Sequence, residues 1–185
     1  YRLLAKVFRY PSVEFFEACE EGAYLSELCE MLSKLSHVGG LADEAAELAS
    51  KLQQDLAGVS FRDSEAAYVR TFDVGAPKPP CPPYEGIYRE GAERTHLMVE
   101  ISELYKHFGL GMNPEEGKRE LPDHLSAELE FLHFLTFKEA QAESENTSEL
   151  LHGYVLAQRD FLQRHMVNWL PSFCAKLQRR TEVPI

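Results

Sequence analysis

Asp123 and His124 are the two residues whose types and spacing most clearly suit a recognition site. They follow Pro122, which ends a loop, and they precede a strongly apolar run. Aspartate is a common helix N-cap, because its side-chain oxygen accepts a hydrogen bond from a free backbone N–H group. The positive potential at a helix N-terminus favours neutral His124, which can then hydrogen-bond in a cleft near physiological pH. Taken alone, the pair is more simply a well-capped helix start, a role that is compatible with recognition.

A second candidate site follows GAPKPPCPP (75–83), which has five prolines in nine residues. Proline lacks an N–H donor and disfavours helix for the residue before it, so we expect an ordered or extended loop. Tyr84, Glu85 and Tyr88 come next. Because tyrosine has an apolar body and a polar tip, they suit a peptide-binding surface. The alternative is that the tyrosines pin the loop to the core.

Tyr68, Phe72 and Asp73 form a third candidate, with two aromatic residues at helical spacing and a carboxylate after them. The functional interpretation is a groove wall with an acidic lip. The alternative is that Tyr68 and Phe72 are core residues and Asp73 is a surface charge.

A polar stripe, His96, Glu100, Glu103 and His107, has spacings of four, three and four residues, which place it on one side of a helix. A helical-bundle metal enzyme would use such residues, but no second segment supplies Glu-x-x-His. The stripe also lies beside the apolar face rather than within it, which favours a solvated flank. The chain has no phosphate-binding loop, nucleophile elbow or zinc-protease motif. We therefore expect no catalytic residues, no metal and no bound cofactor.

Helical periodicity runs through almost the whole chain, whereas period-2 alternation and hairpin-turn dipeptides are missing. Ser12 is expected to cap one helix, and Ser60 with Asp63 resembles a capping box that opens another. The sequence predicts an all-α, single-domain helical bundle of about eight to ten helices over residues 1–185.

The most apolar of these predicted helices begins at Asp123 and ends near Ala142. It is apolar almost all round, which is typical of a central helix in a bundle. Its longest apolar run, 129–137, is too short to span a membrane and is interrupted by Glu130 and His133. A later helix is expected to break or kink at Pro171.

The net charge is −11, from 30 acidic and 19 basic residues. Such a surface repels phosphate, which argues against nucleic-acid binding, and it favours basic peptides. The four cysteines form no Cys-x-x-Cys pair, so we expect reduced thiols in a cytoplasmic protein. Cys81, in the prolyl loop, is expected to be exposed.

Three segments resemble the TorD/DmsD/NarJ family of molybdoenzyme assembly chaperones. ELPDHLSAELEF (120–131) resembles the family signature, and its order Leu-Pro-Asp-His looks closer to NarJ-type members than to TorD- or DmsD-type members. YVRTFDVG (68–75) is similar to the Tyr…Phe-Asp segment on the NarJ side. PPYEGIY (82–88) resembles chaperones dedicated to respiratory dehydrogenases related to dimethyl sulfoxide reductase.

The resemblance implies a TorD-like fold and a cytoplasmic chaperone without enzymatic turnover. Its partner would be the catalytic subunit of a molybdenum-cofactor oxidoreductase, bound through the N-terminal twin-arginine signal peptide or its remnant. It would hold the apoenzyme while the cofactor is inserted, before export or membrane attachment. A monomer or a domain-swapped dimer is expected. The residues that match the signature are Glu120, Pro122, Asp123 and His124, with Leu129 and Phe131 in support.

The acidic surface agrees with an arginine-bearing client, for which Asp73, Glu85 and Asp123 are candidate charge partners. We expect the client groove to lie between the prolyl loop and the start of the 123–142 helix. Two rival interpretations are a metal-dependent helical-bundle enzyme that uses the His96 stripe, and a structural adaptor subunit with no chaperone role.

Overall fold

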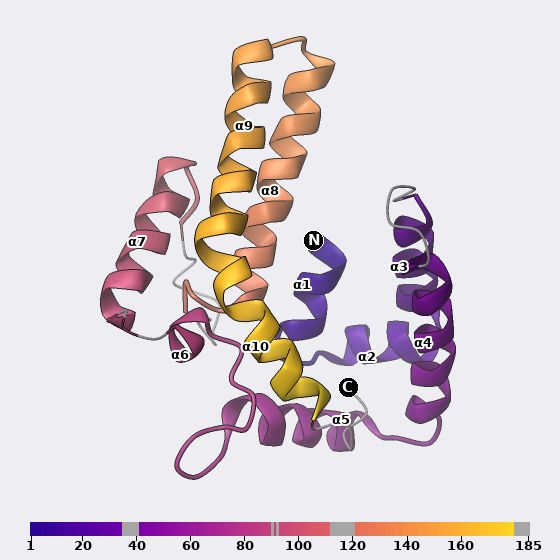
Figure 1. Cartoon of the computed structure of the whole chain (residues 1–185). Helices are drawn as coiled ribbons and strands as arrows, with labels where there is room; N and C mark the ends of the chain where they lie inside the picture. Colours follow the sequence, from indigo (N-terminus) through magenta and orange to yellow (C-terminus); the bar gives the residue numbers. More distant parts are fainter. Residues whose placement is uncertain (35–40, 90, 92, 112–120, 180–185) are drawn as a thin grey trace. The chain divides into compact units, whose positions relative to one another are not determined.

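The computed structural model describes residues 1–34, 41–89, 91, 93–111 and 121–179, and nearly all of them lie in helices or in short connections (Figure 1). Across these ranges the extended pairing is limited to one isolated bridge, between Tyr84 and His124. The predicted all-α fold is therefore confirmed. The described chain forms two compact units. The first unit comprises residues 1–8 and 81–179, and the second comprises residues 9–80. The single domain over 1–185 stays a prediction.

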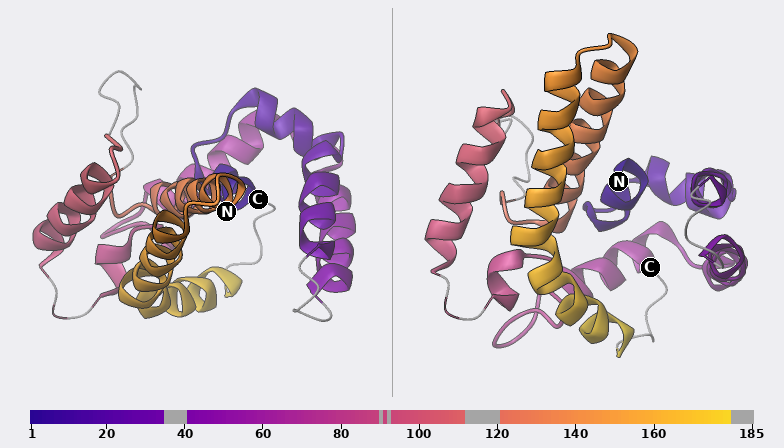
Figure 2. Two further views of the ribbon diagram at one scale, coloured as in Figure 1. Left: turned by 90° about the horizontal axis from the view of Figure 1, so that it is seen from above. Right: turned by 45° about the horizontal axis from the view of Figure 1, so that its top comes forward.

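The first unit is built around an antiparallel helical hairpin, α8 and α9, with α1 packed against α8 (Figures 1 and 2). After α9 the chain continues through a short π-helical turn, η2, into α10. The helix continues past Pro171 to Gln178, so of the two predicted outcomes the break is wrong and the kink stays a prediction. The bounds are α1 Arg2–Phe8, α6 Glu85–Tyr88, α7 Arg94–His107, α8 Leu125–Ser144, α9 Ser148–Phe161, η2 Leu162–Met166 and α10 Val167–Gln178.

The core of the first unit gathers the apolar faces of these helices. Rings from three helices meet here. Phe131 of α8 contacts Phe161 of α9 edge to face and Tyr105 of α7 in a tilted arrangement, each with 4.9 Å between ring centroids. Trp169 of α10 is fully buried beside Phe173. The central role predicted for the apolar helix is thus confirmed. The fully or nearly buried residues of α8 include Leu125, Leu129, Phe131, Leu132 and Leu135.

The second unit contains the predicted N-caps. Ser12 Oγ accepts a hydrogen bond from the Phe15 amide at 3.2 Å, and Ser60 Oγ accepts one from the Asp63 amide at 3.2 Å. Both helix starts are therefore set by local sequence. After α5 the helix loosens into a π turn, η1, where the Thr71 hydroxyl donates to the Ala67 carbonyl. The bounds are α2 Val13–Glu20, α3 Ala23–Ser33, α4 Leu41–Leu56, α5 Phe61–Tyr68 and η1 Val69–Asp73.

Cys81 is fully buried, so the exposure predicted for it was wrong. It lies where the prolyl loop enters the first unit, and the two prolines that follow, Pro82 and Pro83, are buried with it. Proline content indicated a loop correctly but carried no information on its burial. Cys174 on α10 is exposed instead, and none of the four cysteines forms a disulfide bond. No helix among the described residues is both long and apolar enough to cross a membrane.

Candidate functional site

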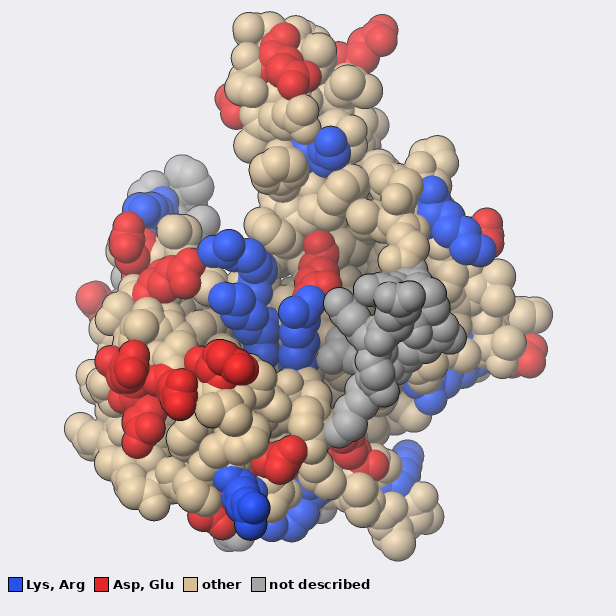
Figure 3. Space-filling model, turned by 180° about the vertical axis from the view of Figure 1, so that it is seen from behind, with Lys and Arg blue, Asp and Glu red and all other residues tan. Residues whose placement is uncertain are grey.

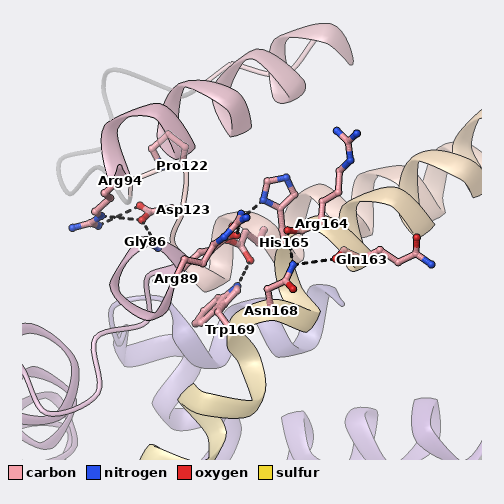
Figure 4. Close-up of polar contacts among 12 residues, drawn as sticks. Gly86, Arg89, Arg94, Pro122, Asp123, Gln163, Arg164, His165, Asn168 and Trp169 are labelled. Carbon is pink, nitrogen blue, oxygen red and sulfur yellow. Dashed lines mark hydrogen bonds and ion pairs between the residues drawn. The ribbon is translucent and has the colours of Figure 1, made fainter. Parts of the chain in front are cut away.

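The candidate site is a seam in which the chain after the prolyl loop pairs with the chain just before α8 (Figure 4). The Glu85 amide donates to the Asp123 carbonyl at 2.9 Å, and the Leu125 amide donates to the Pro83 carbonyl at 2.9 Å. The bridge between Tyr84 and His124 lies between these two bonds. Backbone pairing therefore joins the two segments between which a client groove was predicted, and the groove itself stays a prediction.

Asp123 ties together three elements at this seam. Its Oδ2 accepts hydrogen bonds from the Gly86 amide at 3.2 Å and from Arg94 Nε at 3.0 Å, while Oδ1 accepts from Arg94 Nη2 at 3.3 Å (Figure 4). The side chain is fully buried. A buried carboxylate needs such a charged, two-donor partner to offset the loss of water. Asp123 therefore anchors α6 and α7 to the start of α8, and its predicted role as the N-cap was wrong.

Gly86 and Tyr84 complete the surroundings of Arg94. A Cβ atom at position 86 would collide with the Arg94 side chain and lie 3.0 Å from Asp123 Oδ2, so only glycine fits there. The Arg94 guanidinium lies 4.9 Å from the centroid of the Tyr84 ring, in a cation–π contact. About a third of the Arg94 side chain stays accessible to solvent. The seam thus presents a fixed arginine at its outer edge.

His124 is the N-cap of α8. Its Nδ1 accepts from the Ser126 amide at 3.2 Å and from the Ser126 hydroxyl at 2.7 Å. Its ring meets Tyr84 edge to face at 4.8 Å. Burial lowers the pKa of His124 to about 4, so the neutral form expected from the sequence is confirmed. The side chain is only 3% exposed, so it faces the interior and not a cleft.

Glu85 belongs to a buried polar cluster that was not predicted from the sequence. Its Oε1 accepts from Arg89 Nη1 at 2.8 Å, and its Oε2 accepts from His165 Nδ1 at 2.9 Å (Figure 4). Glu128 of α8 lies beside it and accepts from Trp169 Nε1 at 3.2 Å. Burial, together with the charge of Glu85, raises the pKa of Glu128 well above its ordinary value. The Tyr105 hydroxyl of α7 also donates to the Pro122 carbonyl at 3.0 Å, which links α7 to the segment before α8.

The predicted site residues divide by burial. Glu85, Asp123 and His124 are buried and satisfied within the chain, whereas Tyr84, Tyr88 and Pro122 are partly exposed. Glu120 lies outside the described residues. The Tyr88 ring lies 5.6 Å from that of Trp169, with Lys176 Nζ 5.3 Å from its centroid. These contacts agree with the alternative in which the tyrosines pin the loop.

Tyr68, Phe72 and Asp73 belong to the second unit. Tyr68 and Phe72 are buried against each other, with ring centroids 4.9 Å apart, and Tyr10 packs on Tyr68 at 5.7 Å. Asp73 is exposed at the end of η1. The interpretation of the two rings as core residues and of Asp73 as a surface charge is confirmed.

The polar stripe of α7 is a solvated flank. His96 and Glu93 are both largely exposed and lie 3.6 Å apart, and Glu103 pairs with Lys106 at 2.8 Å. His107 and Glu100 are exposed as well. Within the described ranges no group of three or more His, Cys, Asp or Glu side chains is arranged to hold a metal ion.

Sequence reasoning missed Arg89, Arg94, Glu128, His165 and Trp169. One signal was available: Glu128 and His165 are ionisable residues inside otherwise apolar helical faces, and such residues are buried only when they have partners. Their partners, Trp169 and Glu85, lie 41 and 80 residues away in the chain, so helical periodicity could not identify them.

Comparison with known proteins shows the family. The profile described as "Nitrate reductase delta subunit" matches residues 38–175. The perchlorate reductase assembly chaperone protein of Dechloromonas aromatica is 38% identical, over 97% of this chain and 77% of that one. The selenate reductase assembly chaperone protein of Thauera selenatis is 31% identical, over 96% and 75%. The nitrate reductase molybdenum cofactor assembly chaperone NarJ of Escherichia coli is 27% identical, over 75% and 52%.

Proposed function

Because the chain belongs to the nitrate reductase delta subunit family, which includes the TorD and NarJ redox enzyme maturation proteins, we propose that it is an assembly chaperone for a molybdenum oxidoreductase. The observation that carries the proposal is the match over nearly the whole chain to relatives described as assembly chaperones of perchlorate and selenate reductases. Its client is the catalytic subunit of such an enzyme, which it binds until the cofactor has been inserted. No reaction takes place on the chaperone itself.

The recognition surface that we propose is the outer face of the seam. The buried residues Glu85, Asp123 and His124 hold the seam from within and contact the client only indirectly. The partly exposed side chains Tyr84, Ile87 and Tyr88 provide apolar area, and Leu121, which is exposed, extends it. Aromatic and aliphatic side chains on a rigid backbone suit the apolar part of a signal peptide. A pinned segment loses little conformational freedom on binding.

The arginines of a twin-arginine signal need carboxylates that are accessible. Glu85 and Asp123 do not qualify, because Arg89 and Arg94 already occupy them. Exposed carboxylates gather instead at the free end of the α8–α9 hairpin, where Figure 3 shows several acidic side chains. These are Glu143, Glu145 and Glu149. They are the charge partners that we propose for a signal peptide recognised in the cytoplasm.

The test is co-purification from the native host with a tagged chain. The catalytic subunit of a molybdenum oxidoreductase should be captured when cofactor synthesis is blocked, and it should be absent when the mature enzyme has accumulated. Capture of the mature enzyme in both conditions would indicate an adaptor subunit and contradict the chaperone assignment. The mass of the complex also tests whether a monomer or a domain-swapped dimer binds the client.

A further inference from the structure

Two buried carboxyl groups, Glu85 of α6 and Glu128 of α8, lie side by side within the first unit. Neither side chain is accessible to solvent. Two ionised carboxylates in such a place repel each other strongly, and neither can recover the hydration that it loses. A single proton held between them removes the repulsion and adds a hydrogen bond.

The contacts assign the charge to Glu85. Both of its oxygens accept from strong donors, Arg89 and His165 (Figure 4), which favour the ionised form. The Glu128 carboxyl receives one neutral donor, the Trp169 indole, on Oε2. Its Oε1 is buried and has no donor among the described residues. A proton on Glu128 satisfies this oxygen, because the O–H group then donates to the Glu85 carboxylate.

The remaining charged and titratable groups around Glu128 do not offer it a cation. Asp123, before α8, adds negative charge, and the Tyr105 hydroxyl on α7 is neutral because burial and the nearby carboxylates raise the Tyr105 pKa. Arg89, directly after α6, and His165 on η2 bind Glu85, and Arg94 on α7 binds Asp123. Burial of Glu128 is the largest cause of its raised pKa, with the charge of Glu85 next.

We propose that Glu128 carries a proton shared with Glu85, and that this proton latches α6 onto α8, η2 and α10. Loss of the proton leaves two buried negative charges in contact, which favours release of α6. Glu85 also donates its backbone N–H group to Asp123, so release of α6 opens the seam itself. The latch is a property of this chain alone and does not depend on which client binds.

The direction of the pH dependence follows from the raised pKa. The closed form keeps the proton at a pH where the open, solvated form has lost it, so closure weakens as pH rises. Once the open form is ionised, the opening equilibrium should shift about tenfold per pH unit, the slope for one proton. Acidification should have the opposite effect until Glu128 is protonated in both forms.

The experiment follows the ¹³C shift of the Glu128 carboxyl group and the exchange of the Glu85, Gly86 and Leu125 amides in the whole chain as pH is raised. We expect the carboxyl group to remain protonated at neutral pH. Protection of the three amides, corrected for intrinsic exchange, should then fall about tenfold per pH unit. Glu128→Gln keeps the shape of the side chain and a neutral hydrogen-bond donor at its end. The protection of the three amides in this variant should therefore not change with pH. Glu143→Gln, an exposed change on the same helix, should leave the pH dependence of amide exchange as it is in the wild type.

An ordinary titration of Glu128 in the wild-type chain would overturn the proposal, whatever the variants do. So would a Glu128→Gln variant that folds and keeps the pH-dependent exchange. If Glu128→Gln does not fold, the wild-type carboxyl shift decides alone.

Discussion

Arg94 donates two hydrogen bonds to the fully buried carboxylate of Asp123, at 3.0 and 3.3 Å, across 29 residues of sequence. This pair joins α7 to the residue two positions before α8, and the Gly86 amide joins α6 to the same carboxylate. The motif aspartate is therefore a structural anchor whose positive partner lies at the outer edge of the seam. We therefore expect a substitution of Asp123 to affect client binding only through the segment that it holds.

Removal of the Asp123 carboxylate should destabilise the protein. Asp123→Ala leaves the Gly86 amide and a partly buried guanidinium without their acceptor, which typically costs about 2–4 kcal/mol. Urea unfolding followed by far-UV circular dichroism measures the loss. Asp73→Ala, at an exposed position, is the matched control and should change the free energy of unfolding by less than about 0.5 kcal/mol. Equal effects of the two changes would contradict the anchor role.

A methyl group at position 86 should be poorly tolerated. Gly86→Ala forces Arg94 away from Asp123, and we expect a loss of about 1–3 kcal/mol, the usual range for overpacking. Gly153→Ala in α9 is the control, because a Cβ atom there meets nothing within 4 Å. That change should stabilise the helix by up to about 1 kcal/mol. Thermal melts of both variants give the comparison, and a stabilised Gly86→Ala protein would refute the packing argument.

The buried His124 should make stability fall in mild acid. Its pKa is lowered from 6.5 to about 4, so between these values the unfolded chain binds a proton that the folded chain refuses. The stabilisation from the neutral imidazole is complete above pH 6.5 and is lost as pH falls from 6.5 to 4. The loss in free energy of unfolding amounts to about 3 kcal/mol by pH 4. His124→Asn keeps an N-cap acceptor but cannot titrate. The difference in free energy of unfolding between wild type and variant should shrink toward pH 4, and a constant difference would argue against a neutral, buried imidazole.

Client binding should respond to the outer face of the seam. Ile87→Asp places a charge on partly exposed apolar area without touching the Asp123 contacts, so affinity for the client's N-terminal peptide should fall at least about tenfold. Val99→Asp, on an exposed site of α7, is the control and should bind like the wild type. Isothermal titration calorimetry measures both. Unchanged affinity in a folded Ile87→Asp protein would remove the seam from the recognition surface.

Sequence alone determined the features that depend on local or periodic information. The all-helical class, the caps at Ser12 and Ser60 and the burial of Tyr68 and Phe72 all follow from residues within one or two helical turns. The motif at 120–131 also identified the family, since the order of its residues is visible without a structure. These predictions hold because helix formation and the choice of a buried face are short-range effects.

Only the tertiary structure decided what the polar motif residues do. Asp123 is a capping type, yet His124 caps α8, because Arg94 and the Gly86 amide compete for the carboxylate. Glu85 is bound by His165, 80 residues away. A buried charge is stable only beside its partner, and which partner arrives depends on how distant helices pack. Helical periodicity shows which face of a helix is buried, but not which side chain of another helix will contact that face.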